Sequence, residues 1–234
     1  MGAVPVHDHG PSHLLELTMS AFRVARESAG ATAEGIATTS AATLRVVRER
    51  ERELDSLDRD IDDLVTSTIA RVAEPEAREL LACMKFIISL ERIGDLLLSF
   101  CNRAEVIAAK MDSNDIRDLA LMATRLEKMI GDVQDAFRTR NLDLAVNVLR
   151  ADAEMDRLRN VVMFRHLEPT ESERKLDSFH VLFMAQELER AGDHAKNMAE
   201  EVCHLISGRT VRHILRTYDR PIEQMYLESL RVRE

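Results

Sequence analysis

Four pairs of acidic residues, each spaced four positions apart, are the residues of this sequence best suited to do chemistry. They are Glu51 with Asp55, Glu91 with Asp95, Asp152 with Asp156, and Glu189 with Asp193. Residues four apart lie on one face of a helix, so each pair would present two carboxylates in the same direction. Hard metal cations prefer such oxygen ligands. Spacing alone leaves a second interpretation open, in which the pairs are solvated surface acids neutralised by neighbouring arginines.

An internal repeat relates the four pairs to one another. The sequence LERIGD at residues 90–95 returns as LERAGD at residues 188–193, with an offset of 98 residues. The other two pairs precede these segments in the same order. In the second copy the polar stripe continues at steps of four through Asn197 and Glu201. A repeat of this length predicts that the chain consists of two similar halves.

The composition predicts that helices position these acids. Hydrophobic residues make up 45% of the chain and aromatic residues 4%, and helix-favouring Ala, Leu, Met, Arg and Glu are prominent. Each half reads as three antiparallel helices, so we predict an all-α protein. Residues 27–43, rich in Gly, Ser and Thr, predict a helix end, a turn and a new helix start. The predicted divisions are a flexible N-terminus (1–12), a first three-helix bundle (13–111), a second three-helix bundle (112–208) and a C-terminal extension (209–234).

Capping residues predict where several of these helices begin and end. Asp112 and Asn141 are candidate N-caps. Thr170 with Glu173 forms a candidate capping box for the last long helix. Gly208 is a candidate stop for that helix.

Two glycines inside predicted helices indicate where helices meet closely. Gly94 and Gly192 lie beside the acidic stripes, where glycine costs roughly 1 kcal/mol relative to alanine. We therefore expect another helix to approach them; the alternative is that a stable bundle simply tolerates both glycines. The interior of a three-helix bundle is apolar, so the acidic stripes must lie on the outer face or between the bundles. His194 lies about 100° around the helix from Asp193 and is expected to face solvent.

The sequence also narrows the class of function. A net charge of −9 argues against nucleic-acid partners, which need a basic surface. No apolar run is long enough to span a membrane, no signal peptide is visible, and three scattered cysteines indicate a reducing compartment. We therefore expect a cytoplasmic protein. No known catalytic arrangement is visible, and the single Glu-x-x-His, at Glu201 and His204, argues against a di-iron oxidase, which needs two. We expect no enzymatic activity and assign no catalytic residue.

The repeated motif makes the chain resemble the PhoU family, bacterial regulators of phosphate uptake and of the phosphate-starvation response. The resemblance rests on LERIGD at residues 90–95 and LERAGDHAKNMAE at residues 188–200, supported by the pairs that end at Asp55 and Asp156. It covers roughly residues 14–208. It implies two tandem three-helix bundles related by a pseudo-twofold axis, and a family that is not known for catalysis.

The resemblance also implies a set of metal ligands. Family members carry Glu/Asp-x-x-x-Asp motifs that bind multinuclear iron clusters in some members and other cations, such as magnesium, manganese or zinc, in others. The family's Asp-x-x-x-Asn continuation is present from Asp193 to Asn197, but the first half has Ser99 at that position, which predicts a weaker or empty first site. Carried over by motif, the ligands would be Glu51, Asp55, Glu91, Asp95, Asp152, Asp156, Glu189, Asp193 and Asn197.

By resemblance, the partners would be the ATPase of a phosphate ABC transporter and a sensor histidine kinase. The chain would help hold both in a repressed state when phosphate is plentiful, and it would reach the membrane only through them. We expect a homodimer. Two other functions stay open: a PhoU-like metal-binding adaptor for another transporter or stress pathway, and a metal-storage or metalloenzyme bundle.

Overall fold

The computed structural model describes residues 10–167 and 174–208 of the 234-residue chain, and these residues form helices and turns without a strand. Two of the connections contain 3-10 turns, at Ile69–Arg71 and Ala108–Lys110. The predicted all-α fold is confirmed. The long helices are α1 (Gly10–Ala37), α2 (Ala41–Thr68), α3 (Glu74–Ile107), α4 (Ser113–Thr139), α5 (Leu142–Leu167) and α6 (Arg174–Ser207).

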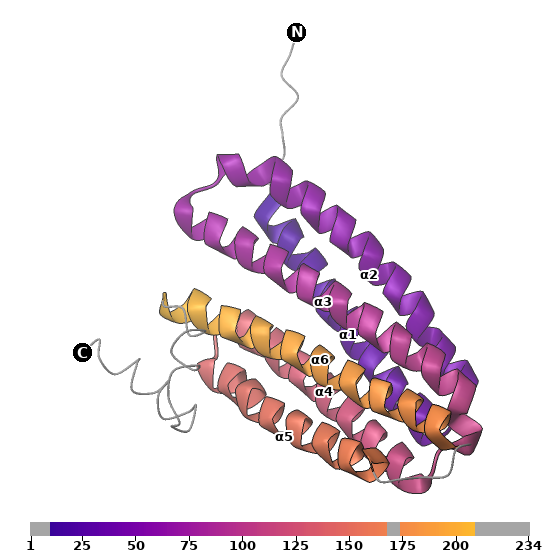
Figure 1. The fold of residues 1–234 in the computed structure, drawn as a ribbon. Coiled ribbons are helices and arrows are strands. Elements are labelled where there is room, and N and C mark those ends of the chain that lie inside the picture. The colour runs from indigo at the N-terminus through magenta and orange to yellow at the C-terminus, as the bar shows by residue number, and fades with distance from the viewer. Residues whose placement is uncertain (1–9, 168–173, 209–234) are drawn as a thin grey trace.

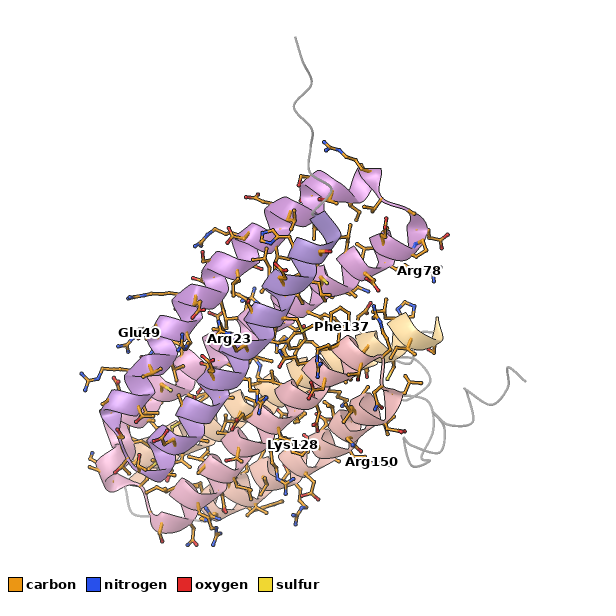
Figure 2. The ribbon with its side chains drawn as sticks, turned by 180° about the vertical axis from the view of Figure 1, so that it is seen from behind. Arg23, Glu49, Arg78, Lys128, Phe137 and Arg150 are labelled. Atoms are coloured by element: carbon orange, nitrogen blue, oxygen red, sulfur yellow. The ribbon has the colours of Figure 1, made fainter. Side chains whose placement is uncertain are left out.

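The helices form two three-helix bundles. Helices α1, α2 and α3 pack on one another, and so do α4, α5 and α6. Between the bundles, α3 packs against α6 and α1 against α4, so these four helices form the middle of the molecule and α2 and α5 form its flanks (Figure 1). In Figure 2, the exposed side chains of Glu49 on α2 and Arg150 on α5 mark the two opposite flanks.

Contacts between the bundles reveal a pseudo-twofold axis. Helices α3 and α6 run antiparallel, because Lys85 pairs with Glu201 at one end and Lys110 pairs with Asp177 at the other, at 2.8 and 3.6 Å. An antiparallel contact between repeated helices is what a twofold rotation produces. The two predicted bundles are therefore arranged as the repeat and the resemblance imply.

The contact between α1 and α4 lies on the same axis. Arg26 and Glu127 occupy equivalent positions, 101 residues apart, and their side chains are 3.8 Å apart. Glu127 also lies over Gly30, and Arg26 lies over the equivalent Gly131. Two equivalent residues contact each other only where the axis passes between them, so the axis runs through this contact.

Aromatic side chains join the two bundles in one hydrophobic core. The ring of Phe86 on α3 lies 5.6 Å from that of Phe22 on α1 and 4.9 Å from that of Phe137 on α4. All three are buried. Fully burying a side chain of this size stabilises the fold by roughly 1.5–3 kcal/mol. Because Phe137 belongs to the second bundle, the core couples the two halves and fixes their relative position.

Helix ends follow the predicted capping signals where the structure describes them. The side chain of Asp112 accepts two backbone N–H groups at the start of α4, at 2.8 and 3.0 Å. Asn141 does the same at the start of α5, at 2.9 and 3.3 Å. Gly208 follows α6 with a φ of 67°, the left-handed conformation typical of a helix stop. The capping box predicted at Thr170 and Glu173 lies outside the described residues.

The predicted break within residues 27–43 occurs late in that stretch. Helix α1 continues to Ala37, and the turn contains Thr39 with a φ of 51°. Within α1 the buried hydroxyl of Thr32 donates to the carbonyl one turn earlier, at 2.9 Å, so its polar group is satisfied inside the helix. Ser40 then caps α2 by accepting a backbone N–H at 3.3 Å. The apolar face of this stretch, with Ala29, Ala33 and Ile36 buried in the core, keeps a poor helix-forming stretch helical.

The two helix-interior glycines lie where helices of the same bundle approach closely, as predicted. A Cβ atom on Gly94 would lie 2.8 Å from Cδ1 of Leu54 on α2. A Cβ atom on Gly192 would lie 3.4 Å from Cγ of Met155 on α5. The first distance is too short for a side chain without movement, and the second is close to an ordinary contact. Gly94 therefore allows α3 to approach α2 beside the first acidic pairs, whereas the contact between α6 and α5 at Gly192 would also admit a Cβ atom.

The three cysteines, Cys83, Cys101 and Cys203, are free and buried in the described helices. Burial raises the pKa of Cys83 to about 11 and that of Cys101 to about 12, so both are protonated thiols at neutral pH. None of the described helices is long and apolar enough to cross a membrane.

Candidate functional site

The first acidic face consists of Glu51 and Asp55 on α2 and Glu91 and Asp95 on α3. Burial raises the pKa of Glu51, and the negative charges of Asp55 and Asp95 raise it further. Burial also raises the pKa of Glu91, followed by the charge of Asp95 and, more weakly, that of Asp55. Each of these two carboxylates is therefore close enough to acids on the neighbouring helix to be repelled by them. The structure brings all four predicted residues of this half together.

Two further acids extend the first acidic face and were missed by sequence reasoning. Asp58 lies one turn beyond Asp55 on α2, and its pKa is raised by burial and then by the charges of Asp62 and Asp55. The negative charge of Asp58 also raises the pKa of Glu91. The signal was present in the sequence, because residues 55, 58 and 62 follow helical three- and four-residue spacing.

Arg92 is the basic residue that pairs with the first acidic face. Its guanidinium lies 3.5 Å from Glu91 and 3.3 Å from Asp95, and 59% of its side chain is exposed. In the part of the chain that the structure describes, Glu51 and Asp55 form no ion pair. Burial and the neighbouring acids outweigh the charges of Arg52 and Arg92, which lower the pKa values of Glu51 and Glu91 respectively.

The second acidic face consists of Asp152 and Asp156 on α5 and Glu189 and Asp193 on α6. Burial raises the pKa of Asp152 and of Glu189, and the charges of Asp193 and Asp156 raise both further. The structure therefore brings these four predicted residues together as well. The pseudo-twofold axis relates this face to the first one.

Two basic residues of the chain itself are paired with the second acidic face. The ammonium group of Lys196 on α6 donates a hydrogen bond to Asp152 on α5. Arg159 lies 3.4 Å from Asp156 and 3.8 Å from Glu189. Burial alone would lower the pKa of Lys196, but its hydrogen bond to Asp152 and the surrounding carboxylates outweigh burial and raise it. Only 29% of the Lys196 side chain and 23% of the Arg159 side chain are exposed, so both cations are held within the face.

The position four residues beyond each motif lies differently from the acids. The hydroxyl of Ser99 donates a hydrogen bond to Glu187 of α6, which also accepts from Arg103 at 3.0 Å. Ser99 is therefore directed toward the other bundle and not toward α2. Asn197, its equivalent, is half-buried on α6.

The expectation that His194 faces solvent is wrong. Its side chain is half-buried, and its pKa is lowered by burial and then by the positive charges of Arg190 and Arg92. Arg92 belongs to α3, so His194 lies at the contact between the two bundles. At this contact the charged form of His194 is disfavoured. Spacing within one helix could not show that a second helix lies beside it.

The donor chemistry of the two faces differs. All side chains of the first acidic face offer carboxylate oxygens, which are the ligands of hard cations. At the second face, Asp152 is already paired with an ammonium group, and Asp156 and Glu189 are paired with a guanidinium group. Across the described residues, no group of three or more His, Cys, Asp or Glu side chains is arranged to hold a metal ion as it stands. Metal binding at the first face therefore requires side chains to change rotamer, and at the second face it also requires Lys196 and Arg159 to leave.

A buried charged network lies away from both faces, at the end of the second bundle. Asp115 and Asp118 on α4 are 2% and 4% exposed. Arg165 donates to Asp115 at 2.6 Å and also to Asp118, and His166 lies 3.0 Å from Asp115 and 3.0 Å from Ser178. Burial raises the pKa of Asp115, but hydrogen bonds from His166 and Arg165 outweigh burial and lower it. This network holds α4, α5 and α6 together.

Comparison with known families decides which proteins share this arrangement. The model of the PhoU domain matches the chain twice, at residues 18–104 and 119–202. The chain belongs to the PhoU family. Each match covers one of the two bundles and includes one acidic face. The PhoU resemblance inferred from the repeated motif is thereby confirmed.

Curated relatives and solved structures agree with this assignment. The chain is 32% identical over 176 residues to a phosphate-specific transport system accessory protein PhoU homolog of Pseudomonas aeruginosa, covering 72% of each chain. It is 31% identical over 200 residues to PhoU homolog 1 of Thermotoga maritima, covering 81% of this chain and 84% of the relative. The crystal structure of PhoU from Pseudomonas aeruginosa matches with a TM-score of 0.77 and 22% identity, over 86% of this chain and 99% of that one. The structure of the phosphate transport system regulatory protein PhoU from Streptococcus pneumoniae matches with a TM-score of 0.74 and 17% identity, over 87% and 98%.

Proposed function

We propose that this protein is a negative regulator of phosphate uptake and of the phosphate-starvation response. It acts by metal-dependent contacts with the ATPase of a phosphate ABC transporter and with a sensor histidine kinase, as a cytoplasmic homodimer. The observation that supports this proposal is membership of the PhoU family across both bundles, together with relatives named as accessory proteins of phosphate-specific transport. The proposal assigns the protein no catalytic role.

The acidic faces supply the physical basis for metal-dependent contacts. A cation held between α2 and α3 would neutralise repelling carboxylates and change the charge of a surface on one flank of the molecule. A partner whose docking surface is acidic would then meet less repulsion, because like charges opposed across an interface disfavour binding. Occupancy by metal would in this way control the affinity for the partner. The metal itself supplies charge and coordination, and the chain supplies the carboxylates that hold it.

The test measures phosphate-starvation gene output in phosphate-replete cells that lack this protein. We expect high output, which the wild-type chain suppresses and the double variant Asp95→Asn/Asp193→Asn does not. Asp135→Asn is the matched control, because Asp135 is also an exposed acid paired with an arginine, Arg138 at 2.9 Å, but lies away from both faces on α4. The control should suppress output like wild type.

Two results would contradict the proposal. Output that stays low in cells lacking the protein would rule out this regulatory role and favour an adaptor for another transporter. If the double variant suppresses output as strongly as wild type does, the protein is still a regulator, but its acidic faces take no part in the regulation.

A further inference from the structure

The two acidic faces differ at two matched positions that flank them. Lys196, which is bonded to Asp152, is equivalent to Leu98 in the first half, 98 residues earlier. Arg159, which lies within 4 Å of two acids of the second face, is equivalent to Asp58, 101 residues earlier. The second half therefore has two cations where the first half has an apolar residue and another acid.

We propose that Lys196 and Arg159 are built-in counterions that close the second acidic face to metal ions, so that the first acidic face alone takes up a divalent cation. The inference rests on the metal dependence in the proposed function, and it concerns which half carries the metal. It reverses the expectation, drawn from Ser99, that the first site is the weaker one.

The second face shows what an acidic face of this geometry requires. Four carboxylates from two helices converge there, and a cation lies against each helix: the Lys196 ammonium at Asp152, and the Arg159 guanidinium at Asp156 and Glu189. A metal ion entering this face would have to expel both groups. Leaving a partly buried cation without its anion is strongly unfavourable. The ammonium group therefore stands in the place that an external cation would take.

The first face has the same converging carboxylates without such a counterion. Arg92 pairs with Glu91 and Asp95, and because 59% of its side chain is exposed it can turn into solvent with less loss of burial than Lys196 or Arg159. Leu98 is half-buried and carries no charge. Asp58 adds another carboxylate one turn beyond Asp55 on α2, and clustered carboxylates offer the oxygen ligands that hard cations prefer. Flanking residues, and not the motif itself, thus decide which face is open.

The first experiment opens the closed face. Mn²⁺ binding to the metal-free full chain is followed by isothermal titration and electron paramagnetic resonance. Lys196→Leu/Arg159→Asp places both residues of the first half in the second, and we expect it to increase the Mn²⁺ bound at saturation. Adding Asp193→Asn to this double variant should remove the gain. Lys196→Arg, which keeps the positive charge, is the matched control and should bind as wild type does.

The reciprocal experiment closes the open face. Leu98→Lys places an ammonium group at the position equivalent to Lys196, within reach of Glu51, the equivalent of Asp152, and we expect the affinity for Mn²⁺ to fall at least tenfold. Leu98→Met, similar in length but uncharged, should retain the affinity within about twofold, since volume-conserving apolar changes are well tolerated. Thermal unfolding of each metal-free variant shows that a loss of binding is not a loss of fold.

Several outcomes would overturn the inference. Three results would do so: wild type that binds no Mn²⁺, a Lys196→Leu/Arg159→Asp variant that binds no more than wild type, or a Leu98→Lys variant that keeps its affinity. Gene output measured with the same variants separates this inference from the proposed function. A chain that binds Mn²⁺ as expected but does not suppress output refutes the function and leaves the asymmetry standing. A chain that suppresses output but binds Mn²⁺ at neither face refutes the asymmetry and leaves the regulator standing.

Discussion

The two halves of this molecule place the same backbone motif in two different electrostatic environments. At the first acidic face, carboxylates of α2 and α3 repel one another and pair only with the exposed Arg92. At the second face, equivalent carboxylates of α5 and α6 are paired with Lys196 and Arg159. A repeated motif therefore does not imply a repeated function, because the residues around it set its charge.

The two halves also differ at one end of each bundle, where the second half has charged residues and the first half has apolar ones. Asp115 and Asp118 on α4 occupy positions that are equivalent to Leu14 and Leu17 on α1, 101 residues earlier. Their partners diverge too, and the full set of matched positions is Leu14/Asp115, Leu17/Asp118, Leu64/Arg165 and Val65/His166. The first bundle closes this end with apolar contacts, and the second closes it with buried charges. Both solutions fill equivalent space, but only the charged one depends on every partner being present.

The largest expected effect tests this difference at the bundle ends. Asp115→Ala leaves Arg165 and His166 without their shared acceptor, and we expect the free energy of unfolding to fall by about 3 kcal/mol. Urea denaturation measures it. The control replaces all four charged residues by their first-half equivalents, Leu, Leu, Leu and Val, and should lose less stability than the single change. A single change that costs less than the fourfold one would contradict the dependence on complete pairing.

The next effect compares the matched positions Asp152 and Glu51. Asp152→Asn removes the anion bonded to Lys196, and we expect a loss of about 2 kcal/mol in the metal-free chain. Glu51→Gln removes a carboxylate whose pKa is raised by burial and by the charges of Asp55 and Asp95, and we expect a gain of less than about 1 kcal/mol. The two unfolding free energies should therefore move in opposite directions. Changes of the same sign would show that the two faces are electrostatically alike.

The glycines beside the faces give a smaller and also asymmetric effect. Gly94→Ala would force Leu54, which is fully buried, to move, and we expect a net loss of about 1 kcal/mol after the gain in helix propensity. Gly192→Ala would contact the flexible Met155 at 3.4 Å and should be neutral or stabilising by up to about 1 kcal/mol. Thermal melts of both variants check this order. Equal losses of stability at the two glycines would contradict this order and show that α2 and α5 accommodate an added methyl group equally well.

The smallest effect is a pH dependence. The pKa values of Glu51 and Glu91 are raised in the folded chain, so the folded chain binds more protons than the unfolded chain as the pH falls toward their ordinary value of about 4.3. The repulsion between these carboxylates and their acidic neighbours therefore lessens as the pH falls and returns as the pH rises. A Glu51→Gln/Glu91→Gln variant should exceed wild type in stability at pH 7 and match it near pH 4. Urea midpoints in a chelating buffer measure the difference, and a gap that does not narrow would contradict the repulsion.

The lowered pKa of Asp115 acts in the opposite direction and at lower pH. Its contribution to stability is present above its ordinary value of about 3.9 and is lost as the pH falls through its folded value. Wild-type stability should therefore decline in strong acid. The fourfold apolar replacement lacks this carboxyl group and should show less of that decline, measured by the same urea midpoints.

Sequence reasoning succeeded where neighbours along the chain decide the outcome. Helix caps at Asp112 and Asn141 and the stop at Gly208 depend on backbone groups within one turn, and all three are confirmed. The acidic pairs share a face because helical periodicity requires it. The close approach at Gly94 could be predicted because glycine lowers the stability of a helix interior, and tight packing of a neighbouring helix offsets that loss.

Reasoning from the sequence failed where a residue of another helix decides the outcome. His194 was expected to face solvent, but Arg92 of α3 lies near it. Arg165 reaches Asp115 across 50 positions of sequence, and no local pattern indicates that pairing. The charges that accompany Asp152 were likewise not predicted, because Lys196 follows it by 44 positions. Contacts of this kind depend on the register and rotation of packed helices.

The sequence by itself determined that this protein is helical, that it is built of two similar halves and that each half carries paired carboxylates. These properties follow from composition, periodicity and repetition, which act over short distances along the chain. Only the tertiary structure decided that the two faces are unequal, because the cations that neutralise one of them come into reach through the packing of α5 on α6. Coulomb interactions depend on distance in space, and the folded backbone sets that distance.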